Sequence, residues 1–264
     1  MRKPIIAGNW KMYKTRAEAL ELVNGLKREL TGVSSVDIVV CPPFTSLQAV
    51  KDILTGSNIE LGAQNVHWEI KGAYTGEVSP VMLKDIGAKF VIIGHSERRT
   101  YFKETDEDIN KKIKSCIKEG LLPIFCVGET LSERESNKTK EVIEKQVNSG
   151  LSNVSNIEME KIVVAYEPVW AIGTGKTATP EQAEEVHKFI RDKIREKFGI
   201  EIAERIRIQY GGSVKPDNIK NLMDQGDIDG VLVGGASLEI DSFVKIVNGV
   251  RSCLGTRHEC DLRF

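Results

Sequence analysis

The sequence has few cysteines, no long hydrophobic segment and no excess of charge of either sign. Its five cysteines are an odd number without a close CxxC pair, which argues against a disulfide framework or a zinc site and favours reduced thiols. No apolar run approaches the roughly 20 residues that a membrane-spanning helix requires. We therefore expect neither a membrane protein nor a disulfide-stabilised secreted domain.

The charge balance and the start of the chain also argue against a membrane or secreted protein. Lys and Arg total 37 and Asp and Glu total 38, so the whole chain has no bias toward nucleic acid or an anionic membrane surface. The first nine residues contain no apolar signal segment followed by a small-residue cleavage site. We expect a soluble, cytoplasmic protein that binds neither nucleic acid nor membrane.

Eight short apolar or β-branched segments alternate with segments of helical periodicity. A length of 264 residues, 41% of them hydrophobic, allows one large α/β domain. Strands that alternate with helices predict a parallel sheet with right-handed crossovers, and eight such units predict closure into a barrel. The predicted strands are residues 5–7, 36–40, 59–61, 90–93, 121–127, 162–165, 206–208 and 230–233.

Polar and glycine-rich residues follow most of these predicted strands. In a barrel, the carboxyl ends of all strands meet at one face, where barrel enzymes keep their active sites. We therefore expect these residues to converge, although each group alone is a weak signal. The groups are Asn9-Trp10-Lys11, Gln64-Asn65, residues 94–99, Glu167, residues 210–214 and residues 233–236.

Residues 164–177 combine a carboxylate at a strand end with a glycine-containing loop. Glu167 stands where the strand stops, and Pro168 bars a regular continuation. This arrangement suits a general base beneath a closing loop, but a capping Glu in a surface loop explains the segment equally well. The Gly-Thr-Gly-Lys-Thr run is not a nucleotide-binding P-loop, because Trp170 stands where that motif requires its first glycine.

Taken together, the motifs resemble the triosephosphate isomerase family, and they follow the family order from about Lys3 to about Asn248. The resemblance implies a single-domain (β/α)8 barrel over residues 1–248. It also implies interconversion of dihydroxyacetone phosphate and D-glyceraldehyde 3-phosphate through an enediolate, without a metal or an organic cofactor, in glycolysis or gluconeogenesis. The matching motifs are Asn9-Trp10-Lys11 and residues 94–99, 165–175, 210–214 and 234–236.

The resemblance assigns catalytic roles to five residues. Glu167 matches the base, and His95 at a helix start matches the neutral electrophile of the standard description of this family. Lys11 matches the cation that stabilises charge on the substrate oxygen, and Asn9 matches a second donor to that oxygen. Glu97 matches an acidic partner that either transfers protons or orients Lys11. A hydrogen-bonded core histidine and an ordinary surface lysine are the structural alternatives for His95 and Lys11.

The resemblance also predicts how the substrate phosphate binds. The matching backbone N–H donors belong to Gly173, Ser213, Gly234 and Gly235, with Asn9 and Lys11 as further substrate-binding residues. Glycine permits close approach of the main chain to an anion. Residues 168–178 match the loop that closes over the substrate and excludes water.

Two other functions remain open from the sequence. The first is a different phosphate-handling barrel enzyme, such as another sugar-phosphate isomerase, which would share the glycine pairs after the last two strands. The second is a catalytically silent relative that serves as a binding or scaffold protein. The first is not expected to carry Asn9, Lys11, His95 and Glu167 together. The second is disfavoured because every position expected to carry chemistry holds the family residue.

Residues 65–79 resemble the long third loop of the family, which inserts into a neighbouring subunit. The resemblance therefore implies a homodimer, with Thr75 near the active site of the partner. Trp68, Ile70 and Tyr74 support this interpretation, because three large apolar side chains would be costly to expose together.

The last segment, residues 249–264, departs from the family pattern. It shows no helical periodicity and adds Cys253 and Cys260 to a chain with few cysteines. We interpret it as a non-native or disordered C-terminal extension, for example a read-through product. A regulatory tail is the alternative.

Overall fold

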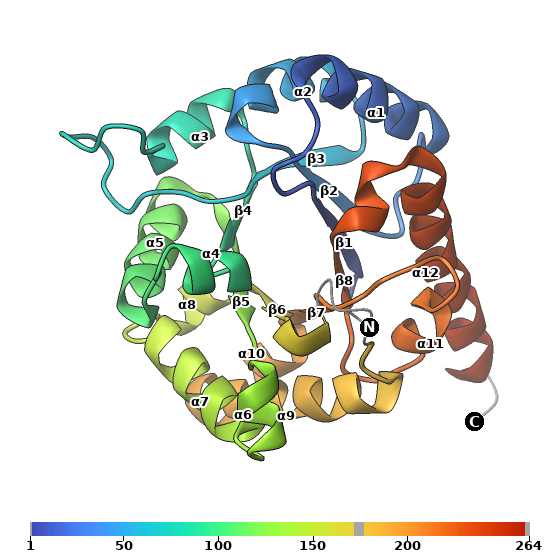
Figure 1. The fold of residues 1–264 in the computed structure, drawn as a ribbon. Helices are drawn as coiled ribbons and strands as arrows, with labels where there is room; N and C mark the ends of the chain where they lie inside the picture. Colours follow the sequence, from blue (N-terminus) through green and yellow to red (C-terminus); the bar gives the residue numbers. More distant parts are fainter. Residues whose placement is uncertain (1, 172–176, 262–264) are drawn as a thin grey trace.

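Eight parallel strands form a closed barrel in chain order, and the ring is visible in Figure 1. The computed structural model describes residues 2–171 and 177–261, with side chains as far as Leu254. Strand β1 pairs with β8, with Ile5 opposite Gly230, which closes the ring. The strands are β1 (Ile5–Asn9), β2 (Asp37–Cys41), β3 (Ile59–Ala63), β4 (Phe90–Ile93), β5 (Leu122–Val127), β6 (Val163–Tyr166), β7 (Arg207–Tyr210) and β8 (Gly230–Val233). The predicted (β/α)8 fold is confirmed.

Helices surround the barrel as an outer ring (Figure 1). The longer ones follow strands in the sequence and cover the outer face of the sheet, with α12 coming after the last strand, and short helical turns follow several strands at their carboxyl ends. They are α1 (Arg16–Glu29), η1 (Phe44–Ser46), α2 (Leu47–Leu54), α3 (Pro80–Ile86), α4 (Ser96–Tyr101), α5 (Asp106–Glu119), α6 (Leu131–Glu135), α7 (Thr139–Gly150), α8 (Asn156–Met159), η2 (Val169–Ala171), α9 (Pro180–Phe198), α10 (Ile200–Arg205), α11 (Ile219–Met223), η3 (Gly235–Leu238) and α12 (Ile240–Asp261).

The strands are mostly apolar because both of their faces are largely buried. On β1, Ile5 and Ala7 belong to the cluster that fills the barrel interior. Ile6, between them, packs into the larger cluster between the sheet and the helices. Local sequence also sets the ends of the helices. In α5, for example, Thr105 caps the first turn, and Gly120 ends the helix with a φ of 84°.

Helix α12 continues beyond the predicted end of the barrel. We expected no helix after Asn248, but α12 runs to Asp261, so that expectation is wrong. Val250 and Cys253 are buried in the main core, and with Ile246 they repeat at spacings of four and three residues, which is helical. The interpretation of residues 249–264 as an extension foreign to the barrel stays a prediction. None of the helices in the described part of the chain combines the length and the apolar character that crossing a membrane requires.

Candidate active site

A cavity of about 380 Å³ lies at the carboxyl ends of the strands. This volume suits a small ligand. Five strand ends, those of β1, β4, β6, β7 and β8, contribute to its wall, so five of the six predicted groups converge there. Gln64-Asn65, after β3, do not line the cavity. The wall consists of Asn9, Lys11, Tyr13, His95, Glu167, Ala171, Gly211, Gly212, Ser213, Val214, Lys215, Leu232, Gly234, Gly235 and Ala236.

Glu167 follows β6 directly, and its side chain is almost fully buried. Its Oε2 accepts the N–H of Ser96 at 3.0 Å, and its Oε1 lies 2.9 Å from His95 Nε2. Gly211 makes room for this side chain, since a Cβ there would lie 2.9 Å from Glu167 Cγ. The carboxylate is thus held between α4 and β7.

His95 immediately precedes α4, and its ring is buried. Its Nδ1 accepts the backbone N–H of Glu97 at 3.2 Å. An accepting Nδ1 carries no proton, so in the neutral ring the proton sits on Nε2 and is donated to Glu167. The start of the helix therefore fixes both the tautomer and the direction of the ring.

The carboxylate and the imidazole shift each other's pKa. Burial alone raises the pKa of Glu167, but His95, the Ser96 N–H and Lys11 together lower it below its ordinary value. Burial alone lowers the pKa of His95, but the carboxylates of Glu167 and Glu97 raise it above its ordinary value. These carboxylates favour a charged ring, whereas the accepting Nδ1 favours the neutral ring that the family resemblance implies.

Lys11 projects its ammonium group toward Glu97, with Nζ 2.7 Å from Oε1. Its backbone is left-handed, with a φ of 52°, which is unusual for a residue with a Cβ. Asn9 Oδ1 accepts the Lys11 N–H at 3.0 Å, and Gln64 Nε2 donates to the Lys11 carbonyl at 2.9 Å and to that of Cys41 at 2.8 Å. Sequence reasoning placed Gln64 at a strand end but did not assign it this role.

The predicted phosphate-binding residues lie in the part of the cavity wall that follows β7 and β8. Ser213, Gly234 and Gly235 line it. Among the described residues, the Ser213 N–H has no acceptor within the protein, so it is available to a ligand. Ser237 Oγ donates to the Gly234 carbonyl at 2.7 Å and so stabilises the turn after β8. Gly173 lies outside the described residues.

Glu129 is a buried carboxylate near the site that sequence reasoning missed. It accepts from Tyr166 Oη at 3.1 Å, from Trp170 Nε1 at 2.9 Å and from Arg134 Nη1 at 3.0 Å. Through Trp170 it anchors the start of the segment after Glu167. Its position after the fifth strand was the available signal, because polar or glycine-rich residues follow most of the other strands.

Metal-binding side chains do not cluster in the part of the chain that the structure describes. No three His, Cys, Asp or Glu side chains there come close enough to hold a metal ion. The groups that line the cavity are a carboxylate, an imidazole, an ammonium group and backbone N–H donors. Those groups suit proton transfer on a small anionic substrate.

Comparison with known proteins agrees with this geometry. The family model described as triosephosphate isomerase matches residues 4–250. The triosephosphate isomerase of Carboxydothermus hydrogenoformans is 63% identical over 249 residues, which cover 94% of this chain and 99% of that protein. The triosephosphate isomerase of Alkaliphilus oremlandii is 58% identical over 248 residues, which cover 94% of this chain and 100% of that protein. This chain is therefore an isomerase that belongs to the triosephosphate isomerase family.

Proposed function

We propose that this isomerase interconverts dihydroxyacetone phosphate and D-glyceraldehyde 3-phosphate by proton transfer through an enediolate. One observation carries the proposal. The carboxylate of Glu167, the imidazole of His95 and the ammonium group of Lys11 line the same cavity as Ser213 and Gly234. A base, two electrophiles and an anion site thus face one small volume.

The reaction moves one proton between adjacent carbons. Glu167 removes a proton from the carbon beside the substrate carbonyl, the electron pair forms the C–C double bond of the enediolate, and the carbonyl oxygen becomes negative. His95 Nε2–H and Lys11 stabilise that oxygen. The hydroxyl proton on the second oxygen passes to the first oxygen, which becomes a hydroxyl group. Protonated Glu167 then returns the carbon-bound proton to the neighbouring carbon while the second oxygen becomes the carbonyl.

Glu167 changes partners during this cycle. Its two oxygens are engaged by Ser96 and His95, so the carboxylate leaves at least one of these contacts to reach a substrate carbon. Once it holds the proton, its charge no longer raises the pKa of His95, and the burial that lowers that pKa remains. In our proposal the ring stays neutral at the enediolate stage because His95 Nδ1 accepts the Glu97 N–H.

Glu97 acts mainly on Lys11 in our proposal. The 2.7 Å ion pair fixes the direction of the ammonium group, and the side chain of Glu97 is 40% exposed at the edge of the site. An ion pair that orients Lys11 explains this geometry without a proton transfer. The phosphate binds to the N–H groups of Ser213, Gly234 and Gly235, and by family resemblance to that of Gly173 in a closing loop over residues 168–178.

A coupled assay with D-glyceraldehyde 3-phosphate tests the function. Glu167→Ala is expected to lower kcat by about 10³-fold or more, because Glu167 supplies the one carboxylate among the described residues that line the cavity. Glu60→Ala is the matched control and should keep the wild-type kcat, since Glu60 pairs with Lys89 outside the cavity. A wild-type protein that turns over another sugar phosphate, but neither triose phosphate, would contradict the proposal.

We also propose that the protein acts as a homodimer in the cytoplasm. Ile70 and Tyr74 of the 65–79 loop are 45% and 44% exposed, and Met12 beside the site is 94% exposed. Apolar side chains this exposed support a contact with a second copy, with Thr75 near the partner's cavity. Sizing at micromolar concentration is expected to give a dimer mass, and a monomer peak would refute this assembly.

A further inference from the structure

Asn218 stands at the start of α11, yet its side chain does not cap that helix. An Asn at this position ordinarily accepts an N–H from the first turn of its own helix. Here the side chain turns back toward the preceding loop. Helix capping therefore does not account for the direction of this amide.

Both ends of the Asn218 amide bind the loop. Its Oδ1 accepts the N–H of Lys215 at 2.8 Å, and its Nδ2 donates to the carbonyl of Ser213 at 2.9 Å. The backbone adds a third contact, because the Asn218 N–H donates to the Lys215 carbonyl at 3.3 Å. One side chain thus bridges the two peptides on either side of Val214.

The bridged segment is part of the cavity wall. Ser213, Val214 and Lys215 all line the cavity. Gly211 and Gly212 come just before them and have no side chains that could fix the direction of the chain. Asn218 accepts the Lys215 N–H, whereas the Ser213 N–H has no acceptor among the described residues.

We propose that Asn218 is a positioning residue that aims the Ser213 N–H at the substrate phosphate. This inference rests on the proposed function, because it requires an anion in the cavity. The amide holds the peptides around Val214 before the ligand arrives, so binding does not have to order the loop. The contact is with the loop and not with the reacting carbons, so Asn218 acts on binding of the phosphate more than on proton transfer.

The test is the effect of Asn218→Ala on binding and turnover. We expect the KM for D-glyceraldehyde 3-phosphate and the inhibition constant of inorganic phosphate each to rise about tenfold, with kcat lowered less than about threefold. Asn218→Ser replaces the two separate ends of the amide with one shorter hydroxyl, which can restore only part of the bridge, so it should give a smaller rise. It also provides the measurement if Asn218→Ala does not fold.

Asn58→Ala is the matched control. The Asn58 amide also bridges two loop carbonyls, those of Leu30 and Val33, at 2.9 and 2.8 Å, but it lies outside the cavity wall. It should lose thermal stability with an unchanged KM. An active wild type together with an unchanged KM and phosphate inhibition in both Asn218 variants would overturn this inference alone. A wild type without triose phosphate turnover would overturn the proposed function.

Discussion

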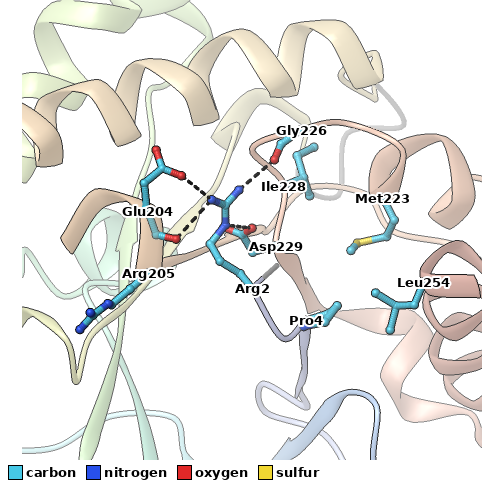
Figure 2. A pocket seen from close by; sticks show the side chains of 9 residues that line it. All are labelled: Arg2, Pro4, Glu204, Arg205, Met223, Gly226, Ile228, Asp229 and Leu254. Atoms are coloured by element: carbon cyan, nitrogen blue, oxygen red, sulfur yellow. Dashed lines mark hydrogen bonds and ion pairs between the residues drawn. The ribbon is translucent and has the colours of Figure 1, made fainter. Parts of the chain in front are cut away.

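Two cavities at opposite ends of the barrel differ in how their charged groups are satisfied. The one at the amino ends of β1, β7 and β8 is larger, about 530 Å³ against about 380 Å³ for the candidate active site. Figure 2 shows its lining, with Arg2 at the centre. Arg2 Nη2 donates to the Gly226 carbonyl at 2.9 Å, Nη1 lies 3.6 Å from a Glu204 carboxylate oxygen, and Nε pairs with Asp229.

Every nitrogen of the Arg2 guanidinium therefore has a partner within the protein. The carboxylate of Asp229 is also shared, since Arg191 Nη2 lies 2.6 Å from it and the Ile208 N–H donates to it at 2.9 Å. In the smaller cavity, by contrast, the Ser213 N–H has no acceptor among the described residues, and Glu167 faces a ligand-sized space. Unsatisfied donors beside a base identify the site better than volume does.

This contrast assigns stability to one end of the barrel and chemistry to the other. Conserved chemistry at the carboxyl ends and structural networks at the amino ends are the general division of labour in (β/α)8 barrels. In this chain the division is visible in individual contacts. A variant at the amino end that changes turnover without a loss of folded protein would contradict this division.

The largest expected effect is on the free energy of unfolding at low pH, and it comes from His187. His187 belongs to the structural network, because its Nδ1 lies 3.2 Å from the Asp227 carbonyl oxygen. Burial lowers the pKa of His187 to about 3 from an ordinary value of 6.5. The unfolded chain binds a proton below pH 6.5 and the folded one does not, so stability is complete above 6.5 and is lost as the pH falls. The loss is about 1.4 kcal/mol per pH unit, or about 3 kcal/mol at pH 4.5.

This loss of stability is measured by urea unfolding of the wild type and of His187→Gln. Both are unfolded at pH 7 and at pH 4.5, at one protein concentration. The variant has no ionisable group at this position, so its free energy of unfolding should fall by about 3 kcal/mol less than that of the wild type between these pH values. Equal losses would show that His187 is not the acid-sensitive group. Equal kcat at pH 7 would place His187 on the structural side of the comparison.

The sequence predicted the barrel well because its signals are local and repeated. Each predicted strand begins and ends within two residues of the observed one, because a strand buried on both faces has a short apolar run in its sequence. The convergence of Asn9, His95 and Glu167 followed from topology alone, because parallel strands in a ring bring their carboxyl ends together. Their roles came from family resemblance and not from the residues themselves.

Contacts between distant polar side chains could not be predicted in the same way. Gln64 reaches across 53 residues to the Lys11 carbonyl, and Asn218 turns away from its own helix toward Ser213. Neither residue has a spacing or a motif that marks it, because each contact depends on where two loops pass each other. The helical continuation after Asn248 was missed for a different reason. The apolar positions of its last turns are widely spaced among charged residues and glycine.

The smallest effect is expected for Arg2→Met at the amino end, which should lower the free energy of unfolding by about 1 kcal/mol. Met keeps part of the side-chain volume and removes the guanidinium, while Asp229 retains Arg191 and the Ile208 N–H, so its charge stays paired. Arg205→Met is the control, because Arg205 is 68% exposed, pairs with Glu160 alone among the described residues and should change the free energy of unfolding by less than about 0.5 kcal/mol. Thermal unfolding and the coupled assay, run on both variants, separate the two ends of the barrel. A fall in kcat/KM for Arg2→Met larger than its loss of folded protein would connect the two cavities energetically and end the simple division between them.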